Sequence, residues 1–323
     1  MVIITGANGF IGSVVLGAVN ANNIPVSVVT DIILPEERST YLQNKKFQNF
    51  LHKDQLWDFL NKKETQITTK WIIHIGANSS TTETNKELLY ETNTQYTEKL
   101  FQWCTQHQVG LIYASSAATY GNGELGYDDE IDSHQLKSLN LYGQSKLDFD
   151  KWAIEQKQTP PYWYGLRFFN VYGPNEYHKG SMSSVIYKSY HQIAEKKSFS
   201  LFKSYLPDYK DGEQMRDFIY VKDISRWILE LMNKKPTNGI YNMGFGQART
   251  WNDLVHAVFK SMQLPSNITY VDMPDNLKNQ YQYFTEAKMQ KWLKAGMSAP
   301  QWSLEDGIKD YVNNYLQKND KVF

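Results

Sequence analysis

The chain has 323 residues, of which 41% are hydrophobic and 21% are charged. These values are those of an ordinary folded protein, and they exclude disordered, collagen-like and disulfide-scaffold classes. Lys and Arg total 34, as do Asp and Glu, so the formal net charge at pH 7 is zero. Without a global positive field, neither nucleic acid nor a membrane is an expected partner, and any anionic ligand must be held by local charges.

The basic residues, the histidines and the single cysteine set further limits. Cys104 cannot form an internal disulfide, which is typical of a reducing compartment. No apolar run approaches the roughly 18 residues of a membrane span, so we expect a cytoplasmic protein. The scattered histidines predict no metal site. Arginines, which suit bidentate phosphate contacts, number only five: Arg38, Arg167, Arg216, Arg226 and Arg249.

The first half of the chain alternates between apolar runs and segments with helical periodicity. Continuous apolar runs of this kind are typical of parallel strands that are buried on both faces. The predicted strands lie at residues 2–5, 26–31, 70–77, 110–117 and 162–171, and the clearest helices at 88–104 and 140–156. The alternation predicts an α/β protein with a Rossmann-type, doubly wound parallel sheet.

The second half is less regular. A helix is predicted at about 181–196, a short strand at 200–202 and a polar insertion at 205–215. Strand and helix patterns return at 216–232 and 239–244. We therefore expect a smaller α/β substrate domain. The expected boundaries are a dinucleotide-binding domain at 1–170, rejoined by about 217–245, and a substrate domain at 171–216 and 246–323.

The segment TGANGFIG places three glycines directly after the first predicted strand. Gly6 permits a tight turn, Gly9 allows close backbone approach to a pyrophosphate, and Gly12 permits close packing of helix on strand. An ordinary strand-to-helix turn also uses glycines. The position after an N-terminal strand, with Asp31 ending the second strand, favours a dinucleotide site.

The identity of the dinucleotide stays open at this point. Asp31 can accept hydrogen bonds from a ribose, which favours NAD, whereas Arg38 and Lys53 could neutralise the 2′-phosphate of NADP. Both basic side chains could instead be solvated surface charges.

A second group of residues suits proton transfer. Tyr142 and Lys146 are four residues apart in a predicted helix, so the ammonium can stabilise the phenolate, and Ser116 ends the strand before them. With 22 Tyr and 29 Lys, random placement yields roughly two such pairs, so the spacing alone is weak. Only this pair follows a strand that ends in a hydroxyl donor, and this context favours Tyr142 as a base.

The chain resembles the extended short-chain dehydrogenase/reductase family in TGANGFIG, SSAATYG, YGQSK and RFFNVYGP, which together span more than half of its length. The resemblance implies a Rossmann domain that binds NAD or NADP, with Ser116, Tyr142 and Lys146 as catalytic residues and a nucleotide-activated sugar as substrate. Sugar dehydratases of that family carry an Asp-Glu pair where this chain has Ala117 and Ala118. Without that acid and base, an epimerase or a simple dehydrogenase is expected.

Within this family the chain is similar to the ADP-L-glycero-D-manno-heptose 6-epimerases, in HIGANSSTTE, YASSAATYG, NVYGPNEYHKGSMSS and NQYQYFTEA. That resemblance implies inversion at C6″ of the ADP-heptose through transient oxidation with a tightly held NADP, for the lipopolysaccharide core. It implies that Tyr142 and Lys179 are the two acid/base residues, one for each face of the sugar. It also implies a homo-oligomer, specifically a pentamer.

The same resemblance implies the binding residues. Those for the cofactor are Gly6, Gly9, Phe10, Ile11, Gly12, Asp31, Ile32, Arg38, Lys53, Ile75, Gly76, Ala77, Asn78, Ser79, Asn93, Lys146, Val171 and Lys179. Those for the substrate are Ser116, Asn170, Ser181, Lys188, Phe202, Lys203, Ser204, Arg216 and Tyr281. For Arg216 the physical argument agrees, because a guanidinium fork suits the ADP pyrophosphate.

Three positions depart from the family pattern: Gly76 replaces an acidic residue, Lys188 a histidine and Arg38 a lysine. Ser181 and Lys188 are seven residues apart, so in one helix they would point the same way. Two alternatives stay open. One is another nucleotide-sugar epimerase or reductase of the family. The other is a nucleotide-sensing protein without catalysis, although such sensors commonly lose the tyrosine or lysine that this chain keeps.

Overall fold

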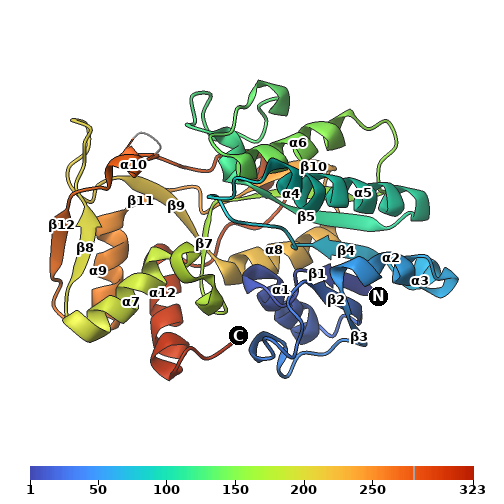
Figure 1. Ribbon diagram of the computed structural model, residues 1–323, viewed down its shortest axis with the longest axis horizontal. Coiled ribbons are helices and arrows are strands. Elements are labelled where there is room, and N and C mark those ends of the chain that lie inside the picture. The colour runs from blue at the N-terminus through green and yellow to red at the C-terminus, as the bar shows by residue number, and fades with distance from the viewer. Residues whose placement is uncertain (279–280) are drawn as a thin grey trace.

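The computed structural model describes residues 1–278 and 281–323, and its larger part is a parallel sheet flanked by helices (Figure 1). The strands of this sheet follow the order β10-β6-β5-β4-β1-β2-β3. Their bounds are β1 Val2–Thr5, β2 Val26–Asp31, β3 Asn49–His52, β4 Trp71–His74, β5 Gly110–Ser116, β6 Trp163–Phe168 and β10 Gly239–Met243. The strand order reverses between β1 and β4, where a Rossmann-type sheet places its ligand crevice. The predicted fold class is confirmed.

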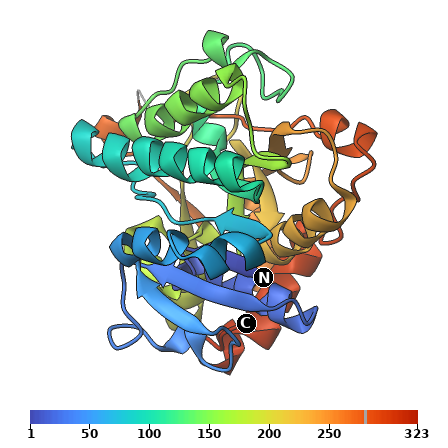
Figure 2. The same cartoon turned by 90° about the vertical axis from the view of Figure 1, so that its right-hand side faces the viewer.

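Both faces of this sheet are buried, which explains the unbroken apolar runs. Successive strand residues point to opposite faces. Ile4 packs into one cluster with Val15 and Trp227, whereas Ile3 packs into another with Phe101. The first face is covered by α1 (Phe10–Ala21) and α8 (Val221–Lys234), and the second by α5 (Tyr96–His107) and α6 (Leu141–Glu155), as Figures 1 and 2 show.

The position of α8 makes one crossover unusual. The connection from β5 to β6 passes over the face that α6 covers, and the connection from β6 to β10 continues in the same direction across the sheet. Because α8 packs against α1, this second connection passes over the opposite face. The two crossovers therefore have opposite hands, although parallel crossovers are almost always right-handed.

The other strands form two small sheets. One has the order β11-β9-β7 and the other pairs β12 with β8. Their bounds are β7 Asn170–Tyr172, β8 Phe199–Phe202, β9 Met215–Tyr220, β11 Ala248–Thr250 and β12 Ile268–Val271. The helices around them are α7 Val185–Lys196, α9 Trp251–Ser261 and α12 Leu304–Asn314. In Figure 1, β8, β12 and α9 lie at one end of the molecule, whereas β7 lies nearer to the large sheet.

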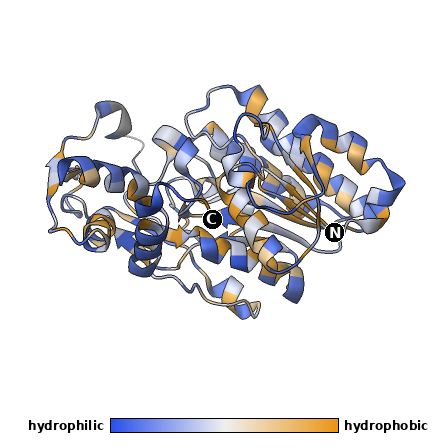
Figure 3. Ribbon diagram, turned by 90° about the horizontal axis from the view of Figure 1, so that it is seen from below, coloured by the Kyte–Doolittle hydropathy of each residue, from blue (hydrophilic) through white to orange (hydrophobic). Residues whose placement is uncertain are grey.

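Short helices complete the described chain. They are α2 Leu56–Leu60, α3 Lys63–Thr68, α4 Lys86–Leu89, α10 Asp275–Lys278 and α11 Gln290–Lys294. The ribbon coloured by hydropathy shows the apolar strands enclosed by helices that carry their polar residues outward (Figure 3). Over the residues that the structure describes, no helix has both the length and the apolar character needed to cross a membrane.

Two helices differ from the prediction. The helix expected from about residue 181 begins at Val185, because the Ser184 hydroxyl caps it by accepting from the Tyr187 N–H at 3.2 Å. Ser181 lies in the preceding 3₁₀ turn, η6 (Tyr177–Met182), so it does not share a helix with Lys188. The helix predicted at 88–104 contains a π-helical segment, η3 (Tyr90–Gln95), between α4 and α5. Such segments are frequent at functional sites.

Candidate active site

A cavity of about 940 Å³ opens at the carboxyl ends of the central strands. A volume of this size can enclose a dinucleotide. The cavity gathers the four proposed catalytic residues, Ser116, Tyr142, Lys146 and Lys179. Every proposed cofactor residue except Asn93 also lines it, namely Gly6, Gly9, Phe10, Ile11, Gly12, Asp31, Ile32, Arg38, Lys53, Ile75, Gly76, Ala77, Asn78, Ser79, Lys146, Val171 and Lys179.

The glycines shape the wall of this cavity. Gly6 has a φ of +67°, and a Cβ on it would lie 2.6 Å from the Cα of Gly76. A Cβ on Gly12 would lie 2.0 Å from the Gly6 carbonyl oxygen. Gly9 is the N-cap of α1 and has no side chain to occupy the first N–H groups of the helix. These N–H groups and the positive end of the helix dipole form a cradle for a pyrophosphate. Gly76, the departure noted above, is required for the close approach of the two turns.

The end of the cavity beyond β2 combines a carboxylate with a guanidinium. Asp31 accepts hydrogen bonds from the backbone N–H groups of Asn8 (2.9 Å), Ile32 (2.8 Å) and Ile33 (3.1 Å). Arg38 donates to the Asn8 carbonyl, and its Nε is buried with no partner among the described residues. The Asp31 oxygens are thus largely engaged, whereas one guanidinium N–H of Arg38 has no partner among the described residues.

Two predicted cofactor residues have local partners. Lys53 is half-buried and pairs with Asp54 at 2.6 Å, with its ammonium 5.9 Å from the centre of the Tyr96 ring. Asn93 lies behind the cavity wall, where its amide donates to the Asn78 carbonyl at 2.9 Å and accepts from the Asn78 N–H at 2.9 Å. Asn93 therefore holds the loop that lines the cavity.

Tyr142 and Lys146, the predicted catalytic tyrosine and lysine, project from the first turns of α6. The Asn140 side chain caps this helix by accepting from the Gly143 N–H at 2.8 Å. Burial raises the pKa of the Tyr142 phenol, while the Ser116 hydroxyl acts to lower it. Burial lowers the pKa of Lys146 to about 8, and the charge of Asp150 opposes that shift. Lys146 is thus poised to change charge close to neutral pH.

Lys179 reaches the same cavity from a different element. It lies in η6, with its ammonium 5.7 Å from the centre of the Phe10 ring. Burial lowers the pKa of Lys179, and the charge of Glu176 opposes that shift. The preceding His178 donates its backbone N–H to the Tyr41 hydroxyl at 3.2 Å, and its Nδ1 lies 3.0 Å from the same oxygen.

The proposed substrate residues, apart from Ser116, do not line the cavity. Arg216 is 8% exposed, donates to the carbonyls of Met215 and Gln282, and lies over the rings of Tyr281 (5.3 Å) and Trp251 (5.8 Å). Around it are the ends of the small sheets, with Asn170 on β7 and Phe202, Lys203 and Ser204 at the end of β8. The first two residues of NQYQYFTEA lie outside the described residues.

Ser181 and Lys188 do meet, although not in the predicted way. The Lys188 ammonium donates to the Ser181 carbonyl at 2.6 Å, across the extended residues Ser183 and Ser184 between η6 and α7. The expectation that both side chains share one helical face is therefore wrong.

The sequence analysis missed His74, which also lines the cavity. Its Nδ1 lies 2.6 Å from the Thr5 hydroxyl, which accepts from the Gly76 N–H at 3.2 Å. Its Nε2 lies 3.0 Å from the Thr97 hydroxyl, which donates to the Asn93 carbonyl at 2.6 Å. Because the Thr97 hydroxyl proton is engaged with Asn93, the His74 Nε2 must donate to Thr97, while Nδ1 accepts from Thr5. The ring is therefore neutral and protonated at Nε2. His74 lies in a predicted strand whose end meets the glycine turn, and this position could have identified it as a site residue.

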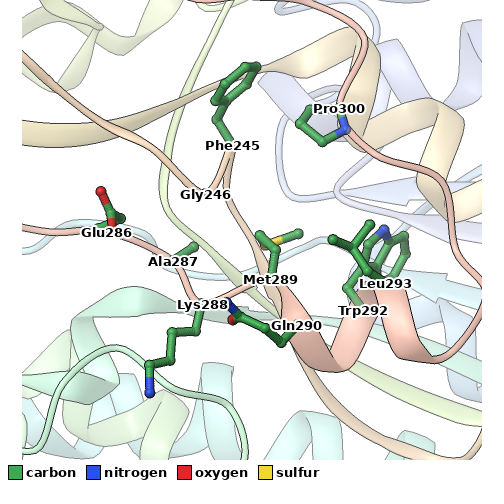
Figure 4. A pocket seen from close by; sticks show the side chains of 10 residues that line it. All are labelled: Phe245, Gly246, Glu286, Ala287, Lys288, Met289, Gln290, Trp292, Leu293 and Pro300. Atoms are coloured by element: carbon green, nitrogen blue, oxygen red, sulfur yellow. The ribbon is translucent and has the colours of Figure 1, made fainter.

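A smaller cavity of about 230 Å³ lies away from this site (Figure 4). It is lined by Phe245, Gly246, Glu286, Ala287, Lys288, Met289, Gln290, Trp292, Leu293 and Pro300. None of the predicted site residues lines it.

Comparison with known proteins places this site in a family. Residues 2–244 match the model of the NAD dependent epimerase/dehydratase family. The chain is 42% identical to the ADP-L-glycero-D-manno-heptose-6-epimerase of Fusobacterium nucleatum and 44% identical to that of Nitratidesulfovibrio vulgaris, with 99% of each chain covered in both cases. The chain therefore belongs to the NAD dependent epimerase/dehydratase family, and its cofactor is a nicotinamide dinucleotide.

Solved structures show the same relationship. The ADP-L-glycero-D-manno-heptose-6-epimerase of Helicobacter pylori superposes with a TM-score of 0.78 at 27% identity, covering 97% of this chain and 95% of that one. The UDP-N-acetylglucosamine 4-epimerase of Methanobrevibacter ruminantium has a TM-score of 0.79 at 21% identity, covering 98% of both chains, which shows the shared fold.

Proposed function

We propose that this protein inverts C6″ of ADP-D-glycero-β-D-manno-heptose to give ADP-L-glycero-β-D-manno-heptose. The observation that carries the proposal is the convergence of Tyr142 and Lys179, from two separate elements, on one dinucleotide-sized cavity. Inversion without net oxidation needs proton transfer in two orientations of the sugar, and two carriers supply it. The relatives named for this reaction cover 99% of the chain.

The residues divide the chemistry among them. A nicotinamide dinucleotide held by the glycine turn and Lys146 would supply reversible hydride transfer at C6″, by way of a C6″ ketone of the sugar. Tyr142 Oη and Lys179 Nζ each exchange a proton with the C6″ oxygen, one as the ketone forms and the other after it has turned over. The Lys146 ammonium lowers the cost of the Tyr142 phenolate, and the Ser116 hydroxyl orients the reacting oxygen. Because the hydride returns, no external reductant is consumed.

Elimination of water is disfavoured at the same edge of the cavity. Ala117 and Ala118 lie in the turn η4 (Ala117–Tyr120) directly after Ser116, and they bring only methyl groups there. A Cβ placed on Gly143 would lie 3.0 Å from the Ala118 Cβ, so α6 packs closely on this turn. A dehydratase requires an acid and a base for the departing hydroxyl, and these positions supply neither.

We further propose NADP as the dinucleotide, because the Arg38 guanidinium keeps an unpartnered donor beside an engaged Asp31. Arg38→Ala should weaken NADP binding by ten-fold or more and leave NAD binding nearly unchanged, measured by calorimetry. Asp54→Ala, which removes the partner of Lys53 without touching Arg38, is the matched control. Equal losses for both dinucleotides in the Arg38 variant would contradict the assignment.

The remaining expectations belong to the same proposal. The ADP pyrophosphate is assigned to Arg216, with Asn170, Ser181, Lys188, Phe202, Lys203, Ser204 and Tyr281 around the nucleotide and the sugar. Because Arg216 is already hydrogen-bonded to two carbonyls, substrate binding requires an exchange of these partners. A place in lipopolysaccharide core synthesis, a cytoplasmic location and a homo-oligomer follow from the family resemblance.

Incubation of the purified protein with ADP-D-glycero-β-D-manno-heptose, followed by separation of the two epimers, tests the function. We expect conversion to an equilibrium mixture without added cofactor, and release of a nicotinamide dinucleotide when the protein is denatured. UDP-glucose and UDP-N-acetylglucosamine serve as control substrates. Inversion of a control substrate but not of the heptose would assign a different epimerase, and retained cofactor without any inversion would contradict an epimerase.

A further inference from the structure

A buried ion pair lies one helical turn beyond the catalytic lysine. Asp150 follows Lys146 by four residues on α6, so Tyr142, Lys146 and Asp150 share one helical face. Asp150 and Arg167 are both 0% exposed, and the Arg167 Nε lies 3.0 Å from an Asp150 oxygen. Buried pairs of this kind cost desolvation and are weak evidence for stability, so the position of the pair calls for another reason.

The hydrogen bonds of Asp150 connect α6 to the strand that carries the catalytic serine. The carboxylate accepts from the Tyr113 hydroxyl at 3.0 Å and from the Ser115 hydroxyl at 2.9 Å. Both residues lie on β5, and Ser115 directly precedes Ser116. Arg167 extends from β6 and also donates to the Ser133 hydroxyl at 2.8 Å. The Asp150 carboxylate therefore connects α6, β5 and β6 directly beneath the catalytic residues.

We propose that Asp150 is a positioning residue for the catalytic trio, which holds α6 against the end of β5 and supplies the fixed negative charge opposite Lys146. Tyr142 and Ser116 must meet within hydrogen-bonding distance, and they come from α6 and β5. The inference rests on the proposed function, since it assigns Tyr142 and Lys146 their roles.

The other groups around Lys146 leave Asp150 as its counter-charge. From β4 comes His74, whose pKa is lowered by burial to about 3, so the ring is neutral. From η3 the buried side chains are the uncharged Asn93 and Thr94, while Glu91 is exposed. From α5 the contacts with α6 are aromatic, as with Phe101 against Phe149.

Asp150 itself faces phenols and one cation. Tyr113 from β5 and Tyr120 from η4 both have pKa values raised chiefly by burial, so they are neutral. The cation is Arg167, whose Nη1 is buried with no partner among the described residues. Removal of the Asp150 charge would leave this guanidinium and Lys146 as neighbouring uncompensated cations. The lysine would then lose its proton at lower pH.

The first test is Asp150→Asn, which keeps the shape of the side chain and removes its charge. In the pH profile of kcat, we expect the decline on the alkaline side, the alkaline limb, to begin at least one pH unit lower. We also expect kcat at pH 8 to fall at least ten-fold. The matched control is Asp223→Asn. Asp223 is also 0% exposed and pairs with Arg226 at 2.7 Å, but it lies on α8 outside the cavity. Asp223→Asn should lower the stability of the protein and leave the alkaline decline of kcat at the same pH as in the wild type.

A substrate-independent readout separates this inference from the proposed function. NMR titration of ¹⁵Nζ-labelled lysine, with Lys146→Met for assignment, should show the Lys146 pKa lowered in Asp150→Asn and unchanged in Asp223→Asn. If the wild type fails to epimerise the heptose while this shift is present, only the proposed function is overturned. An unchanged Lys146 titration in a folded Asp150→Asn overturns the inference.

Should Asp150→Asn fail to fold, Ser115→Ala decides. This variant removes one of the three hydrogen bonds of Asp150 and keeps the charge. We expect kcat to fall about five-fold with KM and the alkaline limb nearly unchanged, because the helix is displaced while the counter-charge remains. Asp150→Glu should keep the limb as well. Wild-type kcat in Ser115→Ala would overturn the positioning role.

Discussion

The two proposed proton carriers reach the cavity from different elements, and burial moves their pKa values in opposite directions. Burial raises the pKa of the Tyr142 phenol and lowers that of the Lys179 ammonium. Each shift favours the neutral form of its group, so a proton can move with little charge separation. At this scale the sequence predicted which residues meet at one cavity, because a glycine turn, a strand end and a helical spacing are local patterns. It missed His74, whose role depends on Thr5 and Thr97 from distant segments.

Loss of either carrier should slow inversion strongly. Tyr142→Phe and Lys179→Met are each expected to lower the epimerisation rate by at least about 10²-fold, as for other positioned acid/base groups. The rate is measured by separation of the epimers, and cofactor retention by absorbance after denaturation. Lys235→Met, at an exposed lysine outside the cavity, controls for loss of a positive charge. Full activity in the Lys179 variant would leave Tyr142 as the sole carrier.

At the scale of elements, the strands and helices of the large sheet follow from sequence periodicity, whereas the connections to the small sheets do not. The predicted runs correspond to β1, β2, β4, β5, β6 and β10. The start of α7 was misplaced because its cap, Ser184, is set by a tertiary contact. Its N–H and hydroxyl donate to the buried Glu176 at 2.6 and 2.7 Å. Glu176 immediately precedes the turn that carries Lys179, so this cap also anchors the segment of a proposed proton carrier.

That double role predicts a difference between two helix caps. Ser184→Ala should lower the free energy of unfolding by about 1–2 kcal/mol, because it removes the cap and one partner of a buried carboxylate. The Ser303 hydroxyl caps α12 by accepting from the Asp306 N–H at 3.1 Å. Ser303→Ala removes this cap and should lower the free energy of unfolding by about 1 kcal/mol. Only the Ser184 variant should also lower kcat. Denaturant unfolding and steady-state kinetics on both proteins provide the comparison. Equal kcat values for the two variants would mean that Glu176 does not position Lys179.

At the scale of the whole molecule, the chain has no net charge, yet its main cavity is lined by more cationic than anionic side chains. Arg38, Lys53, Lys146 and Lys179 line it, against Asp31 and Glu91. This excess of positive charge suits the anionic dinucleotide, and it disfavours any further cation there. Sequence composition predicted that positive charge must be local. It could not place Arg216, because its neighbours Tyr281 and Trp251 are 65 and 35 residues away in the chain and meet it only through the small sheets.

The same positive surroundings make His74 a source of acid sensitivity. Burial lowers the pKa of His74 to about 3, and the nearby Lys146 charge adds to this shift. The unfolded chain, with a histidine pKa near 6.5, therefore binds a proton between about pH 6.5 and pH 3 that the folded protein does not. The stabilisation is fully present above pH 6.5 and is lost as the pH falls. His178, whose pKa burial lowers to about 4, acts in the same direction.

His74→Asn isolates the contribution of the single ring, since asparagine does not titrate. Between pH 7 and pH 4 the free energy of unfolding of the wild type should fall by about 3 kcal/mol more than that of the variant. Guanidinium unfolding of the cofactor-free proteins at several pH values measures this difference. His134→Gln gives the opposite sign, because the hydrogen bonds that the exposed His134 ring donates to Asp132 and Glu155 raise its pKa, and the stabilisation is lost as the pH rises. Parallel pH profiles for wild type and His74→Asn would mean that the ring takes up its proton over the same pH range in the folded and the unfolded protein. The buried, neutral network through Thr5 and Thr97 would then be wrong.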